Sequence, residues 1–84
     1  MYEIILEEPA KKFIRKLEKD KQKRILNKVS QLKTNPGLGK PLKGKLRGLR
    51  SLRTDNYRII YTIKNIELII LVLKAGHRGN VYSG

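Results

Sequence analysis

Apolar and mostly acidic residues alternate over residues 2–7, which is the period of a half-buried β-strand. Pro9 follows at a position suited to the first turn of a helix, where the N–H that proline lacks would be unpaired in any case. Apolar residues then recur at helical spacing over residues 10–17, with basic residues on the opposite side. The pattern predicts a strand followed closely by an amphipathic helix.

A second amphipathic helix is predicted after Asp20, whose side chain can cap a helix start. It is expected to end near residues 35–37, where Asn-Pro-Gly forms a strong stop signal. Because the connection between the helices is short, they should form an antiparallel hairpin. Four apolar residues would form the buried face of the second helix: Ile25, Leu26, Val29 and Leu32.

The rest of the chain is predicted to form a loop and three strands. Residues 35–48 hold four of the seven glycines and two of the three prolines, which is typical of a long loop. The last predicted strand is nearly all apolar and so is expected to be central in a sheet. The strands are expected over residues 49–53, 57–63 and 66–73, with turns at 55–56 and 64–65.

These elements predict an α+β fold in the order β-α-α-β-β-β. The helical hairpin should pack on one face of a mainly antiparallel four-stranded sheet, and the other face should stay open. A chain of 84 residues supports one modest core, so residues 1–84 are expected to form a single domain.

The composition indicates the cellular location of the protein. There is no cysteine, which excludes disulfides and cysteine-based zinc sites and favours the cytoplasm. The N-terminus is acidic and lacks the apolar segment of a signal peptide. The longest apolar run, residues 68–73, is far shorter than the roughly 20 residues of a membrane-spanning helix. We therefore expect a cytoplasmic protein without a membrane partner.

The charge is large and unevenly placed. The formal net charge is +13 at pH 7, and residues 21–54 contain eleven Lys and Arg and no acid. Charge of this size opposes compact folding unless a polyanion offsets it, and basic side chains displace counterions from nucleic-acid phosphates. A solubilising or thermophile-type surface is the alternative, although glutamate usually balances lysine on such surfaces. Nucleic acid is therefore the expected ligand.

Two arginines are expected to face one another. If residues 55–56 form a two-residue turn, Arg53 lies directly opposite Arg58 on the neighbouring strand. Opposed like charges destabilise a sheet, so such a pair indicates an anionic ligand between or above them. A shifted register, or an ion pair of one arginine with Asp55, is the alternative explanation.

His77 is the only histidine, and no pair of carboxylates lies near it in sequence. Two-metal and two-histidine ribonuclease chemistry therefore have little support, and we expect neither a metal nor a cofactor. If the protein cleaves RNA, it must do so with arginine, lysine, tyrosine and at most one histidine. Arginine can stabilise the extra negative charge of the transition state, and tyrosine can stack on a base or donate a proton.

Three segments carry a resemblance to a known family: residues 42–48, 52–61 and 76–82. The second is similar to the "LR-x-GDYR-x-x-Y" strand pair, and the third to the "HR-x-x-x-Y" ending, of the RelE/ParE superfamily. These proteins are the toxins of bacterial and archaeal toxin–antitoxin pairs. With the early strand and two helices, the resemblance covers essentially the whole chain and implies a RelE-like, microbial ribonuclease-type fold.

The resemblance to the RelE branch implies a ribosome-dependent mRNA endonuclease. That branch cuts mRNA in the ribosomal A site without a metal, by attack of the 2′-hydroxyl on the adjacent phosphate. Arg58 matches the arginine that contacts the scissile phosphate, and Arg53 matches a basic position beside it. Arg78 matches the arginine that stabilises the transition state, and Tyr82 matches the tyrosine that stacks on a displaced base.

The resemblance leaves the general base open, because Leu49 and Ser51 stand where such toxins carry two strand lysines. His77 is a candidate for that role and a further expected RNA contact. Other basic residues of the loop and the following strand are also expected to contact phosphates: Lys43, Lys45, Arg47 and Arg50.

The resemblance also implies partners. They are the ribosome, its mRNA, and a small acidic, RelB-like antitoxin that covers the basic surface of the helices and of residues 40–47. Two alternatives to mRNA cleavage stay open. One is a ParE-type poison of DNA gyrase without nuclease activity, and the other is a non-catalytic relative that binds RNA or the ribosome.

Overall fold

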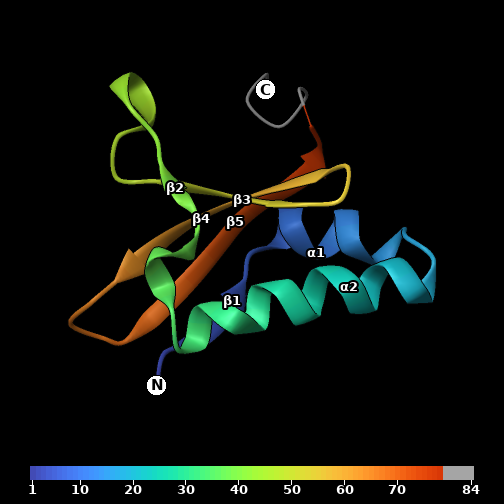
Figure 1. Ribbon diagram of the computed structural model, residues 1–84, viewed down its shortest axis with the longest axis horizontal. Coiled ribbons are helices and arrows are strands. Elements are labelled where there is room, and N and C mark those ends of the chain that lie inside the picture. The colour runs from blue at the N-terminus through green and yellow to red at the C-terminus, as the bar shows by residue number, and fades with distance from the viewer. Residues whose placement is uncertain (79–84) are drawn as a thin grey trace.

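The computed structural model describes residues 1–78, and Figure 1 shows their arrangement. Short 3-10 turns lie in the connections, at Gln31–Lys33, Pro36–Leu38 and Gly44–Leu46. The helices and strands are β1 Glu3–Leu6, α1 Glu8–Arg15, α2 Lys19–Ser30, β2 Lys40–Pro41, β3 Arg50–Thr54, β4 Tyr57–Lys64 and β5 Ile69–His77.

The strands of this part of the chain form one sheet in the order β1-β5-β4-β3-β2. β1 runs parallel to β5, and the other neighbouring pairs are antiparallel. The α+β class, the order of the predicted elements and the mainly antiparallel sheet are confirmed. The strand number is corrected from four to five, because β2 pairs with β3 over two residues inside the predicted loop. Pro41 is tolerated in β2 because an edge strand needs fewer ladder hydrogen bonds.

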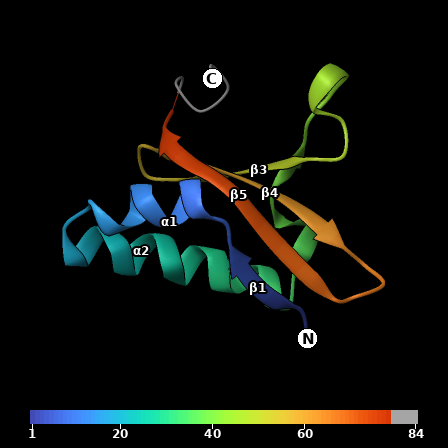
Figure 2. The same ribbon diagram turned by 180° about the vertical axis from the view of Figure 1, so that it is seen from behind.

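Both helices cover the same face of the sheet, as Figures 1 and 2 show from opposite sides. The apolar stripe of each helix is buried against that face, through Ala10 and Ile14 of α1 and Ile25 and Val29 of α2. The prediction that Leu26 is buried was wrong. It follows Ile25 directly, so it points about 100° away around the helix, and it is 41% exposed. The sheet contributes Leu52, Tyr57, Ile59, Tyr61, Ile70 and Val72 to the core.

β5 begins later than expected and ends later. Leu68 has a left-handed φ of 57°, and its N–H donates to the carbonyl of Asn65 at 3.3 Å. These contacts place residues 65–68 in a turn, so the strand starts at Ile69 and runs to His77. β5 lies between β1 and β4, which confirms the central position predicted from its apolar sequence.

A bulge in β5 changes which side chains face outward. Ile60 of β4 pairs with Lys74, whereas the next residue, Tyr61, pairs with Val72, so Leu73 is an extra residue in β5. Simple alternation from the buried Val72 would place Lys74 on the helix-covered face. The extra residue shifts the alternation by one position, and Lys74 therefore lies on the opposite, open face of the sheet.

Candidate nucleic-acid interface

The two arginines predicted to face one another do so. Arg53 of β3 pairs with Arg58 of β4, directly beside the closing pair of Thr54 and Tyr57. The register between these strands has no shift at this point, so the predicted two-residue turn is confirmed. Residues directly opposite in an antiparallel pair have Cβ atoms about 5 Å apart. Both side chains therefore start from adjacent points on the open face.

The turn that opposes the arginines is held from two sides. Asp55 has a left-handed φ of 51°, which a short polar residue tolerates better than most. Its Oδ2 lies 3.4 Å from Nη1 of Arg24 in α2, which gives the carboxylate an ion-pair partner from the helix layer. The N–H of Arg78 donates to the carbonyl of Asn56 at 2.9 Å. The turn thus brings the backbone of Arg78 to the same end of the sheet as Arg53.

A second row of side chains crosses the open face next to the arginine pair. Lys40 of β2 pairs with Ser51 of β3, Ser51 pairs with Ile60 of β4, and Ile60 pairs with Lys74 of β5. On β3 and β4 this row lies two residues from Arg53 and Arg58, so it shares their face. Lys74 was not predicted here because the last strand was expected to end at residue 73, and a strict two-residue period extended beyond it would place Lys74 on the core face. The position of Lys40 in this row was not predicted either, since no local signal reveals the pairing of a two-residue strand.

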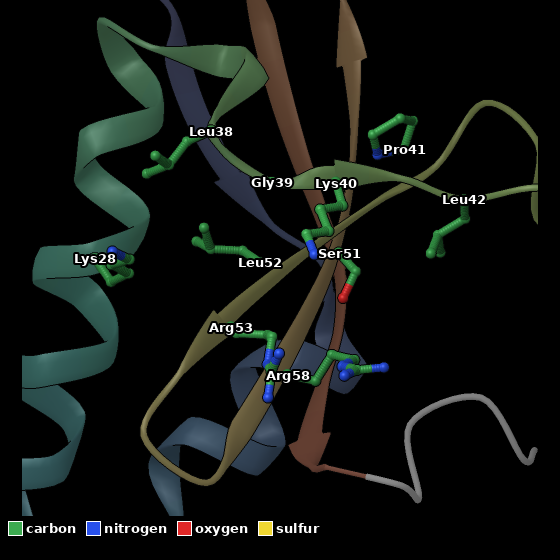
Figure 3. Close-up of a pocket in the computed structure, with 10 residues that line it drawn as sticks. All are labelled: Lys28, Leu38, Gly39, Lys40, Pro41, Leu42, Ser51, Leu52, Arg53 and Arg58. Atoms are coloured by element: carbon green, nitrogen blue, oxygen red, sulfur yellow. The ribbon is translucent and has the colours of Figure 1, made fainter.

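A hollow of about 400 Å³ opens at this edge of the sheet, between β3, α2 and the segment after the second helix (Figure 3). Ser51 is 7% exposed, and its Oγ has no hydrogen-bond partner among the described residues. In Figure 3 the hydroxyl lies between the side chains of Lys40 and Arg58. The lining is Lys28, Leu38, Gly39, Lys40, Pro41, Leu42, Ser51, Leu52, Arg53 and Arg58.

One wall of the hollow is anchored by hydrogen bonds from the sheet. The buried Tyr61 hydroxyl donates to the carbonyl of Pro36 at 2.6 Å and accepts from the N–H of Gly39 at 2.9 Å. The Nε of Arg50 donates to the Gly39 carbonyl at 3.1 Å, and its Nη2 donates to the Gly37 carbonyl at 3.4 Å. Arg50 pairs with Tyr61 and so faces away from Arg53 and Arg58. The structure therefore does not bring Arg50 to the arginine pair and uses its guanidinium to brace the wall.

The basic loop after β2 lies farther along the open face. The Oγ1 of Thr62 donates to the carbonyl of Gly48 at 2.9 Å, which ties the loop to β4. Thr62 is four residues from Arg58 along the strand, about 13 Å away. Three predicted phosphate ligands lie in this loop, all of them exposed: Lys43, Lys45 and Arg47.

His77 does not join the arginines either. It pairs with Tyr57 and lies on the helix-covered side, where its ring centroid is 5.5 Å from that of Phe13 and 5.5 Å from that of Tyr57. Its roles as an RNA contact and as a general base stay predictions. Arg78 is exposed. Tyr82 lies outside the described residues.

Residues 1–78 contain no group of three or more His, Asp or Glu side chains with the spacing of a metal site. Within the same range, neither helix is long and apolar enough to cross a membrane.

Comparison with known proteins finds one matching family model and a similar curated protein. Residues 4–82 match the family model described as "ParE toxin of type II toxin-antitoxin system, parDE". The chain is 36% identical over 45 residues to Toxin RelG of Mycobacterium tuberculosis, which covers 54% of this chain and 52% of the relative. The chain therefore spans about half the length of the curated relative it matches.

Solved structures share the fold over nearly the whole chain. The toxin–antitoxin complex RelBE of M. tuberculosis superposes with a TM-score of 0.84 and 26% identity, covering 92% of this chain and 98% of the other. The archaeal RelE–RelB complex of Pyrococcus horikoshii gives 0.75 and 25%, covering 93% and 96%. The isolated RelE toxin of E. coli gives 0.78 at 20% identity, covering 92% and 84%, which supports the likeness of fold.

Proposed function

Because the chain belongs to the ParE toxin family of type II toxin–antitoxin systems, within the RelE/ParE superfamily, we propose that it is a toxin that inhibits translation by cleaving mRNA in the ribosomal A site. The observation that carries this proposal is the pairing of Arg53 with Arg58 on the open face, beside a hollow at the edge of the sheet. Two opposed arginines repel one another, and a phosphate bound between them would attract both guanidinium groups and offset that repulsion.

The proposed reaction needs charge stabilisation more than it needs a metal. The 2′-oxygen of one nucleotide attacks the adjacent phosphorus, the bond to the 5′-oxygen of the next nucleotide breaks, and a 2′,3′-cyclic phosphate remains. A proton leaves the 2′-hydroxyl and another reaches the departing 5′-oxygen. Arg58 and Arg53 would hold the non-bridging oxygens, whose negative charge grows in the transition state. Arg78, next to the turn, and Tyr82 are proposed to complete the site, and the ribosome would hold the codon in line.

The proposed partners follow from the same surface and from the relatives. The matched structures of M. tuberculosis and P. horikoshii are complexes of a toxin with its antitoxin. We propose an acidic, RelB-like antitoxin for this chain, because a net charge of +13 needs a compensating partner when no RNA is bound. The proposed setting is the cytoplasm, where ribosomes and mRNA are found.

A ParE-type action on DNA gyrase is the second candidate. It is favoured by the matched family model, which describes ParE toxins, and by Ser51, which stands where RelE toxins carry a lysine. In this alternative the arginine face binds a protein or DNA and cleaves nothing. The third candidate is a binding module that docks on RNA without cleaving it.

One experiment separates these candidates. The protein is added to a cell-free translation system, and primer extension maps the ends of the mRNA on stalled ribosomes. We expect cuts within the A-site codon, which Arg58→Ala abolishes and Arg15→Ala, an exposed arginine of α1, leaves intact. Intact mRNA together with inhibited gyrase supercoiling would identify the ParE-type action. Intact mRNA with RNA binding alone would identify the binding module.

A further inference from the structure

We propose that Lys40, Ser51 and Lys74 form a second phosphate site, adjacent to the arginine pair, so that the open face binds two successive phosphates of one RNA strand. This inference rests on the proposed function, since it takes RNA as the ligand. It assigns phosphate contacts to three residues for which neither the sequence pattern nor the resemblance indicated that role.

The spacing of the two rows fits two phosphates. Ser51 and Arg53 are two residues apart on β3, and Ile60 and Arg58 are two apart on β4. A strand rises about 3.3–3.4 Å per residue, so the rows lie roughly 7 Å apart on the same face. Successive phosphates of an extended single strand are separated by a similar distance. A strand of RNA running parallel to β3 and β4 would thus present one phosphate to each row.

The buried hydroxyl of Ser51 indicates a ligand. Its Oγ has no hydrogen-bond partner among the described residues, although Ser51 is only 7% exposed. A buried polar group without a partner is unfavourable, whereas a phosphate oxygen would accept the hydroxyl proton. Ser51 lines the hollow together with Lys40, Arg53 and Arg58, and so its buried hydroxyl lies next to space that a ligand can enter.

The two lysines flank this hydroxyl within one row. Lys40 is directly opposite Ser51, and Lys74 follows on the far side of Ile60. Ile60 is 4% exposed and forms an apolar floor between them, which lowers the local dielectric constant and strengthens charge–phosphate attraction. The bulge at Leu73 turns Lys74 to this face, and bulges often reorient a side chain toward a site.

The test uses a trinucleotide RNA with 2′-O-methyl groups, which cannot be cleaved, and fluorescence anisotropy at low salt. Lys74→Ala should weaken binding roughly five- to tenfold and reduce the slope of log K against log salt by about one, as expected for one lost phosphate contact. Ser51→Ala should weaken binding roughly threefold, and Ser51→Thr should restore it because threonine keeps the hydroxyl. Lys12→Ala, an exposed lysine of α1, is the matched control.

A neutral methylphosphonate at one of the two linkages shows which row contacts which phosphate. With one linkage neutral, Lys74→Ala should have no further effect while Arg58→Ala keeps its full effect. With the other linkage neutral, the two variants should exchange roles. Thermal unfolding of each variant checks that the fold is intact.

Each outcome bears on one proposal. If the wild-type protein does not bind the RNA, the second site is refuted, whereas the proposed function is decided separately by cleavage on ribosomes. If it binds but Lys74→Ala and Ser51→Ala behave like Lys12→Ala, the second site is refuted while the proposed function stands. If Lys74→Ala weakens all three ligands equally, the lysine acts as diffuse charge, and the two-phosphate arrangement is likewise refuted.

Discussion

The hydroxyl of Tyr61 offers a sharp test of how the wall of the hollow is held. It accepts a hydrogen bond from the N–H of Gly39 at 2.9 Å and donates one to the carbonyl of Pro36 at 2.6 Å. Tyr61→Phe removes both bonds and leaves the buried ring in place. The loop segment that carries Lys40 would then lose its main tie to β4.

The expected loss follows from the burial of the two partners. Gly39 is buried, so its unpaired N–H costs about 1–3 kcal/mol of unfolding free energy. Pro36 is half-buried, so water can reach its carbonyl, and the loss there is about 0.5–1 kcal/mol. We expect Tyr61→Phe to lower the free energy of unfolding by about 1.5–4 kcal/mol. For a domain of this size, each kcal/mol corresponds to about 4–8 °C in Tm.

Urea denaturation followed by circular dichroism measures this loss as a lower midpoint at unchanged slope. Tyr57→Phe is the matched control in the same strand. The Tyr57 ring packs on Phe13 and His77, and no hydrogen bond of its hydroxyl occurs within residues 1–78. The control should change stability by less than about 0.5 kcal/mol. Equal losses in the two variants would refute the reasoning, because they would show that the hydrogen bonds to the loop contribute nothing specific.

Three further predictions concern the same region. Gly39→Ala should destabilise the protein by at least about 1–3 kcal/mol in thermal unfolding, because the added Cβ would lie 2.8 Å from the carbonyl oxygen of Ser51. Arg53→Gln should raise stability by up to about 0.5 kcal/mol at low salt, by relieving repulsion with Arg58, yet weaken RNA binding; no stabilisation, or one that persists in 1 M salt, would contradict this. His77→Phe should keep the ring packing and leave cleavage on ribosomes unchanged, and lost cleavage with an intact fold would restore a role in the site to this histidine.

Local patterns in the sequence were sufficient for most of the secondary structure. The apolar stripes of residues 10–17 and of α2 follow the helical period, and both helices form in these segments, although α1 ends at Arg15 and α2 ends at Ser30, before the expected stop near residues 35–37. Leu26 was misassigned because a run of adjacent apolar residues cannot all lie on one side of a helix. The opposition of Arg53 and Arg58 was also predictable, because a two-residue turn determines the register of the strands that it joins.

The open face was less predictable. Lys74 lies there because Leu73 is an extra residue in β5, and the bulge arises from the pairing with β4. Arg50 lies on the other face, where its partners are the carbonyls of Gly37 and Gly39, more than ten positions away in the chain. Alternation within a single strand predicts neither the bulge at Leu73 nor the hydrogen bonds of Arg50.

The sequence by itself therefore determined the α+β order of elements, the excess of positive charge and the arginine pair. The order of elements and the arginine pair depend on neighbours within a few residues, and the charge depends only on the number of charged residues. The tertiary structure decided which cations share a face with that pair. It placed Lys40 opposite the buried Ser51, and Lys74 beyond Ile60 in the same row, and it placed Arg50 and His77 on the helix-covered side. The physical reason is that strand register and bulges are set by pairing between distant segments, and a shift of one residue moves a side chain from one face of a sheet to the other.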